Sequence, residues 1–323
     1  MTTTTPALVR DRGELAAALA AQDATTMPRA EGAPDGGRRY RRAVVMTMGA
    51  LHDGHLALVA EAKRLAEVVV VTIFVNPLQF GPAEDLARYP RDLDGDLRLL
   101  AGPGLLGPSD VVFAPTVDVV YPDGDPTVRV GAGALGDVLE GASRPGHLDG
   151  VLTVVLKLLH LTQPDVAVFG AKDAQQLAAV RRMVHDLDVR VDVVAHPTVR
   201  EDDGLARSSR NAYLAADERA RARALAAALD AGAAAADDGA GPAGVLAAAR
   251  SVLDARLTPD DAVDYVALVD PATFADAGPG TERALLLLAV RVGATRLIDN
   301  ATVVLRGAVA AAARTGHGDG ADA

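Results

Sequence analysis

The chain has 323 residues, half of them hydrophobic, and carries a formal net charge of −11. This length suffices for about two ordinary domains, and the acidic balance argues against a nucleic-acid partner held mainly through its phosphates. The lack of cysteine excludes disulfides and thiolate chemistry and fits a reducing cytoplasm, and we find neither a membrane-spanning apolar run nor a signal-peptide pattern.

Strand and helix patterns alternate over the first two thirds of the chain. A short helix is predicted at residues 14–22, followed by a mobile loop at 23–38 that is rich in glycine, proline and polar residues. The apolar, β-branched runs at 40–48 and 67–75 predict strands buried on both faces, with a helix between them. Further strands are expected at residues 109–115, 165–170 and 189–197, and further helices at 150–163 and 174–187. The alternation predicts an α/β domain over residues 1–197, with a doubly wound parallel sheet.

The rest of the chain follows another pattern. Two alanine-rich helical stretches at residues 215–238 and 242–256 precede three strand-like runs at 262–270, 283–292 and 295–305. Helices followed by strands predict a smaller α+β lid domain over residues 198–312. The last residues, 313–323, read as a disordered tail.

The first cluster of chemically informative residues is TMGALHDGH, residues 47–55, between the first buried strand and its helix. A helix N-terminus at a strand end offers backbone N–H groups and partial positive charge to a phosphate. His52 and His55 are three residues apart, so they lie on one face of a first helical turn. We expect them to donate hydrogen bonds to phosphate oxygens in a transition state. A zinc site is less consistent with the pattern, because no third ligand lies nearby in the sequence.

Polar residues also follow the second buried strand. Asn76 and Gln79 can hold a substrate's hydroxyl and carboxylate without imposing charge, although Asn-Pro is also a common turn signal. The acidic series Asp92, Asp94 and Asp96 can bind Mg²⁺ through water, but a solvated acidic loop explains it better.

Two later segments open helices with charged residues. In RPGH, Arg144 and His147 can meet an anion, although a surface loop explains them almost as well. In FGAKDAQQ, residues 169–176, Lys172 can place a point charge on a phosphate and Asp173 can cap a helix or meet a metal, with Gln176 one turn further on.

A last segment, DGLARSSRN, spans residues 203–211. Ser208, Ser209 and Arg210 supply two hydroxyls and a guanidinium, a composition suited to triphosphate oxygens. Taken alone, this segment and FGAKDAQQ are each as readily structural as functional.

The five segments together resemble the motifs of the pantothenate synthetases. TMGALHDGH, IFVNPLQFG with EDLARYPR, RPGH-x-DGV, FG-x-KD-x-QQL and DGLA-x-SSRN occur in that family's order and spacing, over about residues 40–215. The family belongs to the nucleotidyltransferases with an HxGH signature, and its second phosphate-binding segment is similar to the KMSKS loop of class I aminoacyl-tRNA synthetases. The resemblance implies a Rossmann-like nucleotide-binding domain with a C-terminal lid.

The resemblance also implies an activity in two steps. Pantoate attacks the α-phosphate of ATP, which releases pyrophosphate and leaves pantoyl-adenylate. The amine of β-alanine then attacks the acyl carbon and gives pantothenate and AMP. ATP and Mg²⁺ are the implied cofactors, and a cytoplasmic homodimer without nucleic-acid or membrane partners is the implied form.

Site residues follow from the same resemblance. His55 is the implied proton donor, and His52 stabilises the phosphates. Lys172, Ser208, Ser209 and Arg210 complete the catalytic set. The implied ATP site comprises Met48, Gly49, Ala50, Leu51, His52, Asp53, Gly54, His55, Gly170, Ala171, Lys172, Asp173, Val199, Arg207, Ser208, Ser209 and Arg210. The implied acid and amine site comprises Gln79 and Gln176 for pantoate, with Asn76 and Arg144 beside them, and Gln79 also meets β-alanine.

Four positions depart from the family pattern: Met46, Ala171, Ala174 and Arg207 replace the usual Pro, Glu, aromatic residue and Met. Drift that preserves function explains them, but so does a paralogous amide ligase that adenylates another hydroxy acid or uses another amine. Two further alternatives are a nucleotidyltransferase that stops at nucleotide transfer and a nucleotide-binding protein without catalysis.

Overall fold

The computed structural model describes residues 5–24, 41–81, 86, 89–102, 104–278 and 280–305. The chain divides into two compact units, the first comprising residues 1–171 and 175–199 and the second residues 172–174 and 200–323. The expected loop at 23–38 lies outside the described residues except for Asp23 and Ala24, which end a helix. The expected tail at 313–323 lies outside them altogether.

A six-stranded sheet forms the centre of the first unit. Its strands are β1 (Ala7–Val9), β2 (Arg42–Thr47), β3 (Val68–Ile73), β4 (Val111–Phe113), β5 (Val166–Gly170) and β6 (Asp192–His196). Its helices are α1 (Arg12–Ala24), α2 (Asp53–Leu65), α3 (Leu93–Leu100), α4 (Val117–Val120), α5 (Leu139–Ser143), α6 (His147–Thr162) and α7 (Ala174–Asp186), with 3₁₀ turns η1 (Pro77–Gln79) and η2 (Gly133–Gly136). The strand order is β1-β4-β3-β2-β5-β6, and every neighbouring pair is parallel. The predicted parallel sheet is confirmed, whereas the short strand β1 was not predicted.

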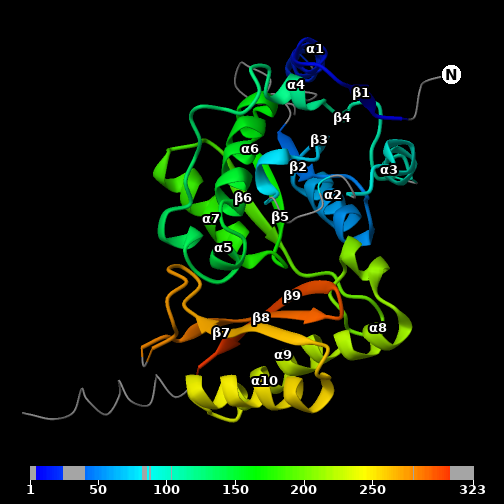
Figure 1. The fold of residues 1–323 in the computed structure, drawn as a ribbon. Helices are drawn as coiled ribbons and strands as arrows, with labels where there is room; N and C mark the ends of the chain where they lie inside the picture. The colour runs from blue at the N-terminus through cyan, green and yellow to red at the C-terminus, as the bar shows by residue number, and fades with distance from the viewer. Residues whose placement is uncertain are drawn as a thin grey trace, which may run out of the picture. The chain divides into compact units, whose positions relative to one another are not determined.

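The two faces of this sheet carry separate cores, because side chains alternate along each strand. Val44 of β2 packs with Leu15 of α1, Val155 of α6 and Val180 of α7 in one apolar cluster. The neighbouring Val45 packs on the other face, in a cluster that holds Val59 and Ala62 of α2 and Leu100 of α3. Helices therefore cover both faces of the sheet (Figure 1). This double covering explains why the central strands β2 and β3 read as unbroken apolar runs.

The second unit is an antiparallel sheet with helices on one face. It contains η3 (Ser209–Tyr213), α8 (Ala216–Ala222), α9 (Ala224–Asp237), α10 (Pro242–Arg256), β7 (Ala262–Val269), β8 (Arg283–Val292) and β9 (Thr295–Val304). The strand order is β7-β8-β9, with both pairs antiparallel. The helix predicted at 215–238 is in fact two helices, α8 and α9, which meet at Arg223.

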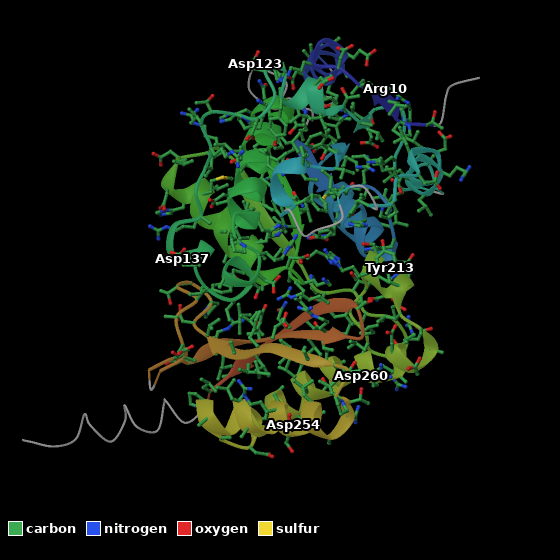
Figure 2. The ribbon with its side chains drawn as sticks, in the orientation of Figure 1. Arg10, Asp123, Asp137, Tyr213, Asp254 and Asp260 are labelled. Atoms are coloured by element: carbon green, nitrogen blue, oxygen red, sulfur yellow. The ribbon has the colours of Figure 1, made fainter. Side chains whose placement is uncertain are left out.

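The helices of the second unit are amphipathic against their sheet. On α10, Leu253 is fully buried in the cluster that also holds Leu229 of α9 and Leu286 of β8. Its neighbour Asp254 is exposed on the side of α10 turned away from the sheet (Figure 2). The α+β composition expected for this part of the chain is confirmed. No helix in the described ranges is long and apolar enough to cross a membrane.

Candidate active site

The two histidines of the HxGH motif meet at the start of α2. His52 is the N-cap residue of this helix and His55 is its third residue. Their rings stack with centroids 4.1 Å apart and planes 28° from parallel, so the predicted common face is confirmed. The backbone N–H of His52 donates to Nδ1 of His55 over 3.4 Å. This bond favours the tautomer with its proton on Nε2, because Nδ1 then acts as an acceptor.

The backbone between β2 and α2, residues 48–52, is called the histidine loop below. It turns through left-handed conformations at Gly49 (φ +80°) and Ala50 (φ +50°). The N–H of Gly49 donates to Oγ1 of Thr47 over 3.2 Å. The N–H groups of Ala50 and Leu51 donate to the two carboxylate oxygens of Asp96, over 3.1 and 2.7 Å. Side chains of the protein therefore hold three successive N–H groups of this loop.

The acidic series before β4 differs from its prediction. Residues 93–100 form helix α3, and Asp92 caps it by accepting a hydrogen bond from the N–H of Gly95 over 2.9 Å. Asp94 is exposed, but Asp96 is only 3% exposed, so the predicted solvated loop is wrong for Asp96. Burial raises the pKa of Asp96 despite the hydrogen bonds from Leu51 and Ala50. The described residues contain no group of three or more histidine or acidic side chains arranged to hold a metal.

Asn76 and Gln79 form a buried pair of amides at the end of β3. Nδ2 of Asn76 donates to Oε1 of Gln79 over 3.1 Å, and its Oδ1 accepts from the hydroxyl of Tyr121 over 2.9 Å. Nε2 of Gln79 in turn donates to Sδ of Met48 over 2.9 Å. The structure thus joins a predicted nucleotide residue, Met48, to the predicted acid-binding pair. The sequence reasoning missed Tyr121, which no motif marks and whose pKa is raised by burial.

The loop that contains Gln79 is also fixed by α6 and by Arg144, which lies between α5 and α6. Nδ1 of His147 contacts the carbonyl oxygen of Gln79 at 2.8 Å, and Nη1 of Arg144 contacts Nε2 of His147 at 2.9 Å. The carbonyl of Gly150 accepts from Nδ2 of Asn76 over 3.0 Å. A Cβ at Gly150 would lie 2.2 Å from the carbonyl oxygen of Leu78, so only glycine permits this approach of α6 to η1. Arg144 and His147 therefore orient the amide pair.

The two glutamines at the start of α7 differ in their surroundings. Gln175 is buried, donates to the carbonyls of Leu135 and Val138 over 2.6 and 2.9 Å, and accepts from the N–H of Glu140. The side chain of Gln176 is half-buried and makes no hydrogen bond with other described residues. Gln175 is therefore a structural anchor that the sequence reasoning missed, and Gln176 keeps an amide available for a ligand.

The remaining predicted phosphate residues belong to the second unit. Lys172 is mostly buried, with Nζ 3.8 Å from Oδ1 of Asp173. Its carbonyl accepts a hydrogen bond from Nδ2 of Asn300 over 2.8 Å. This bond connects the lysine backbone to strand β9.

Residues 206–211, called the Ser-Ser-Arg segment below, are organised around the carboxylate of Glu201. Nδ2 of Asn211 donates to Oε1 of Glu201 over 2.7 Å and to the carbonyl of Ala206 over 3.0 Å. Arg219 donates to the other oxygen of Glu201, and Nη1 of Arg207 lies 3.4 Å from Oε1. Burial acts to raise the pKa of Glu201, but the hydrogen bonds from Asn211 and Arg219 lower it overall. The sequence reasoning missed Glu201 and Arg219.

Within this segment, Oγ of Ser208 accepts from the N–H of Arg210 over 3.3 Å and caps η3. The side chains of Ser209 and Arg210 are half-buried and exposed, respectively. Because His52 and His55 belong to the first unit and the Ser-Ser-Arg segment to the second, the expected convergence of these groups on one triphosphate stays a prediction.

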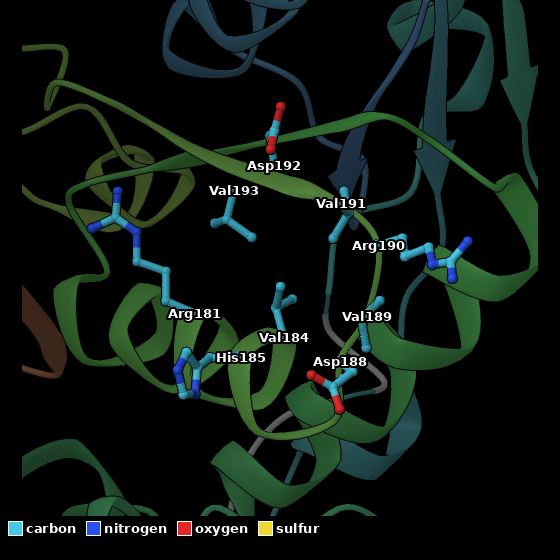
Figure 3. Close-up of a pocket in the computed structure, with 9 residues that line it drawn as sticks. All are labelled: Arg181, Val184, His185, Asp188, Val189, Arg190, Val191, Asp192 and Val193. Atoms are coloured by element: carbon cyan, nitrogen blue, oxygen red, sulfur yellow. The ribbon is translucent and has the colours of Figure 1, made fainter.

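A surface pocket of about 660 Å³ lies elsewhere on the first unit, against α7 and the edge strand β6 (Figure 3). Four valines and five charged or imidazole side chains line it: Arg181, Val184, His185, Asp188, Val189, Arg190, Val191, Asp192 and Val193. No predicted site residue is among them. Its position therefore does not mark the predicted site.

Comparison with known proteins identifies close relatives. The sequence pattern of the pantoate-beta-alanine ligase family matches residues 23–302. The chain is 60% identical over 273 residues to the pantothenate synthetase of Thermobifida fusca (strain YX), with 82% of this chain and 90% of the relative covered. It is 57% identical over 307 residues to pantothenate synthetase 4 of Frankia alni, with 92% of this chain and 97% of the relative covered.

Solved structures give the same result. The crystal structure of the pantothenate synthetase from Thermus thermophilus is similar with a TM-score of 0.77 and 44% identity, over 91% of this chain and 98% of that chain. The pantoate-beta-alanine ligase from Francisella tularensis, crystallised with beta-gamma ATP and beta-alanine, is similar with a TM-score of 0.69 and 30% identity. That comparison covers 91% of this chain and 97% of the other.

Proposed function

The chain belongs to the pantoate–β-alanine ligase family and ligates pantoate to β-alanine with ATP, and we propose that its described loops bring ATP and pantoate together for a reaction in two steps. In the first step, pantoate attacks the α-phosphate of ATP and pyrophosphate leaves. In the second step, the amine of β-alanine attacks the acyl carbon of the adenylate and AMP leaves. The contact of Met48 with Gln79 is the observation that carries this proposal, because it joins the histidine loop to the amide pair.

In the first step, His55 donates a hydrogen bond to the phosphate oxygens from Nε2. Two features support this role: the bond from the His52 N–H to Nδ1 favours the Nε2–H tautomer, and the ring lies at the N-terminus of α2. Helix N-termini carry partial positive charge that favours phosphate. His52 stacks on His55 and orients it. Nucleotide contacts are also proposed for Asp53 and Gly54, the first residues of α2.

Pantoate is proposed to lie at the amide pair. Gln79 and Gln176 hold its hydroxyl and carboxylate, and Gln79 also meets β-alanine. Asn76 orients the side chain of Gln79 through the hydrogen bond between their amides, while Arg144 and His147 hold its backbone. Neutral amides suit this task, because they bind an anionic acid without lowering the nucleophilicity of its carboxylate as strongly as a cation would.

Lys172 and the Ser-Ser-Arg segment are proposed to contact the phosphates of ATP. Lys172 provides a point charge, and Ser208, Ser209 and Arg210 provide hydroxyl and guanidinium donors. The remaining ATP contacts come from Gly170, Ala171, Asp173, Val199 and Arg207. The assignment of residues 1–197 and 198–312 as substrate-binding and lid domains belongs to the same proposal.

Mg²⁺ is proposed to arrive bound to ATP. The described residues offer no cluster of three acidic or histidine side chains for it. Such a cage is not required, because protein-bound Mg²⁺ usually keeps several waters and takes one or two carboxylates plus substrate phosphates. A homodimer in the cytoplasm, where ATP is available, is the proposed form of the enzyme.

A substrate panel tests the division into steps. The enzyme is incubated with ATP and pantoate, with and without β-alanine, and pyrophosphate and AMP are measured separately. We expect pyrophosphate release with pantoate alone and rapid AMP release only after β-alanine is added. Parallel reactions replace pantoate or β-alanine with other small hydroxy acids or amines. Absence of turnover with pantoate plus β-alanine, together with turnover of another pair, would overturn the proposal.

A further inference from the structure

We propose that Asp96 is a positioning residue for the adenylation step: its buried carboxylate fixes the backbone of the histidine loop and, through it, the side chain of His55. This inference rests on the proposed role of His55. Asp96 itself reaches no substrate in this scheme, because it lies beneath the loop and is 3% exposed.

The geometry is that of a clamp made by one carboxylate. Oδ2 of Asp96 accepts from the N–H of Ala50 over 3.1 Å, and Oδ1 accepts from the N–H of Leu51 over 2.7 Å. The acid comes from α3, more than forty residues further along the chain. Each oxygen thus binds one of two consecutive peptide groups, which fixes the orientation of both. Leu51 directly precedes His52, so a rotation of these peptides moves the imidazoles.

The loop needs such a clamp because its conformation is unfavourable by itself. Ala50 has φ +50°, where a residue with a Cβ is strained. Gly49 is matched to the same arrangement: a Cβ at this position would lie 2.9 Å from Oδ2 of Asp96 and 3.2 Å from Cγ2 of Ile73. Charge-assisted hydrogen bonds to a carboxylate are stronger than neutral ones. The carboxylate therefore stabilises a backbone that would otherwise relax to another conformation.

The clamp also changes which groups meet the nucleotide. The N–H groups of Gly49, Ala50 and Leu51 already donate to Thr47 and Asp96. These three donors are therefore engaged within the protein. Contacts of this loop with the nucleotide are therefore left to its histidine side chains and to the first turn of α2, whose position the clamp sets. Among the described residues, Asp96 belongs to no group of three or more histidine or acidic side chains that could hold a metal.

Asp96→Asn tests the clamp. The amide keeps one acceptor oxygen but opposes the second N–H with its own NH₂ group. We expect kcat for pyrophosphate release to fall by about 10–100-fold, because small displacements of a catalytic group can cost about 10²-fold. KM for ATP changes far less, since the loss falls on the transition state. The matched control is Asp118→Asn, which removes an exposed acid from the first turn of α4 in the same unit and should keep wild-type rates.

A double-mutant cycle with His55→Ala separates positioning from a general structural role. If Asp96 acts through His55, Asp96→Asn lowers kcat strongly in the wild-type background but by no more than about twofold in the His55→Ala background. Equal losses in both backgrounds would overturn the inference. Thermal unfolding of each variant shows that the rates refer to folded enzyme. If Asp96→Asn does not fold, Asp96→Glu replaces it in the double-mutant cycle, because this variant displaces the carboxylate but keeps its charge. Equal losses in both backgrounds would again overturn the inference.

The proposed function fails by a different outcome. Lack of wild-type turnover with pantoate and β-alanine counts against that function. An active wild-type enzyme with equal losses in the cycle counts against Asp96 alone.

Discussion

The histidine loop and the Ser-Ser-Arg segment each donate hydrogen bonds to one buried or half-buried carboxylate, but the two carboxylates have different kinds of donor around them. Asp96 accepts hydrogen bonds from neutral backbone N–H groups, those of Ala50 and Leu51. Glu201 accepts from Asn211 and from the guanidinium of Arg219, with Arg207 nearby. The histidine loop is thus fixed by hydrogen bonds from neutral peptide groups, whereas the Ser-Ser-Arg segment is fixed by a network that includes ion pairs.

This difference gives the two acids opposite pKa shifts. Burial raises the pKa of Asp96 because its neutral donors do not offset the loss of hydration. Burial also acts on Glu201, but its hydrogen bonds and the arginines lower its pKa overall. A raised acid pKa means that ionisation costs stability as the pH rises through the folded-state value. A lowered one means that ionisation contributes stability, which is lost as the pH falls.

The largest expected effect comes from removing the imidazole that the first loop positions. His55→Ala should reduce adenylation by about 10²–10³-fold, the usual loss for one transition-state donor. The measurement is single-turnover release of pyrophosphate from ATP and pantoate. The control is His185→Ala, which removes a histidine whose side chain is 80% exposed at the end of α7. Near-normal pyrophosphate release from His55→Ala would contradict the assigned role and remove the catalytic reason for the clamp.

The next effect tests the charged network of the second loop. Glu201→Gln should lower the free energy of unfolding at neutral pH by about 1.5–3 kcal/mol, the range for hydrogen bonds to a charged group. Because the folded-state pKa of Glu201 lies below the reference value of 4.5, its contribution is complete above that pH. It disappears as the pH falls through the folded-state value. Urea unfolding between pH 3 and pH 7 measures this.

The matched comparison is between wild type and variant over that pH range. Their difference in unfolding free energy should shrink as the solution is acidified below about pH 4.5. A difference that stays constant with pH would show that the loss comes from the NH₂ group of Gln, which opposes the donors of Asn211 and Arg219, and not from the missing charge. The contrast with Asp96 would then rest on geometry alone.

The sequence predicted some of these features because they depend on local pattern. Unbroken apolar runs identified β2 and β3, and the three-residue spacing of His52 and His55 placed both rings on one face. The role of Asp96 was not predicted, because its hydrogen-bond donors are peptide groups and no residue type in the sequence marks them. Its spacing from Leu93 and Leu100, three residues before and four after, is the one signal that places it on the buried face of α3.

The structural roles of Glu201 and Gln175 were not predicted for a related reason. Their partners are distant in the chain or are backbone groups, such as the carbonyls of Leu135 and Val138. Motif spacing identifies residues that face a ligand, but it does not show which polar residues hold those motifs from behind. The meeting of the two loops on one nucleotide likewise depends on domain arrangement and stays a prediction.

A smaller effect on stability tests the backbone strain of the histidine loop. Ala50→Gly removes the Cβ that is strained at φ +50°. We expect the free energy of unfolding to rise by about 0.5–1 kcal/mol, the strain relieved less the added entropy of glycine in the unfolded chain. Thermal unfolding measures this, with Ala142→Gly in α5 as a control at a helical position, where glycine should destabilise instead. A destabilised Ala50→Gly would mean that the clamp leaves the loop unstrained.

The smallest effect concerns Arg207, where the family usually has Met. Its guanidinium lies 3.4 Å from Glu201, and its side chain is one-third exposed, so the pair is worth about 0.2–1 kcal/mol. Arg207→Met should therefore change the free energy of unfolding by no more than about this amount. Arg219→Met should cost more, because Arg219 also donates to Asp203 over 3.0 Å. Urea unfolding of both variants decides the order, and KM for ATP reports whether the charge at position 207 serves the nucleotide. An Arg207→Met variant as unstable as Arg219→Met would make Arg207 a full member of the network that holds the second loop, and its departure from the family pattern would then be a structural change.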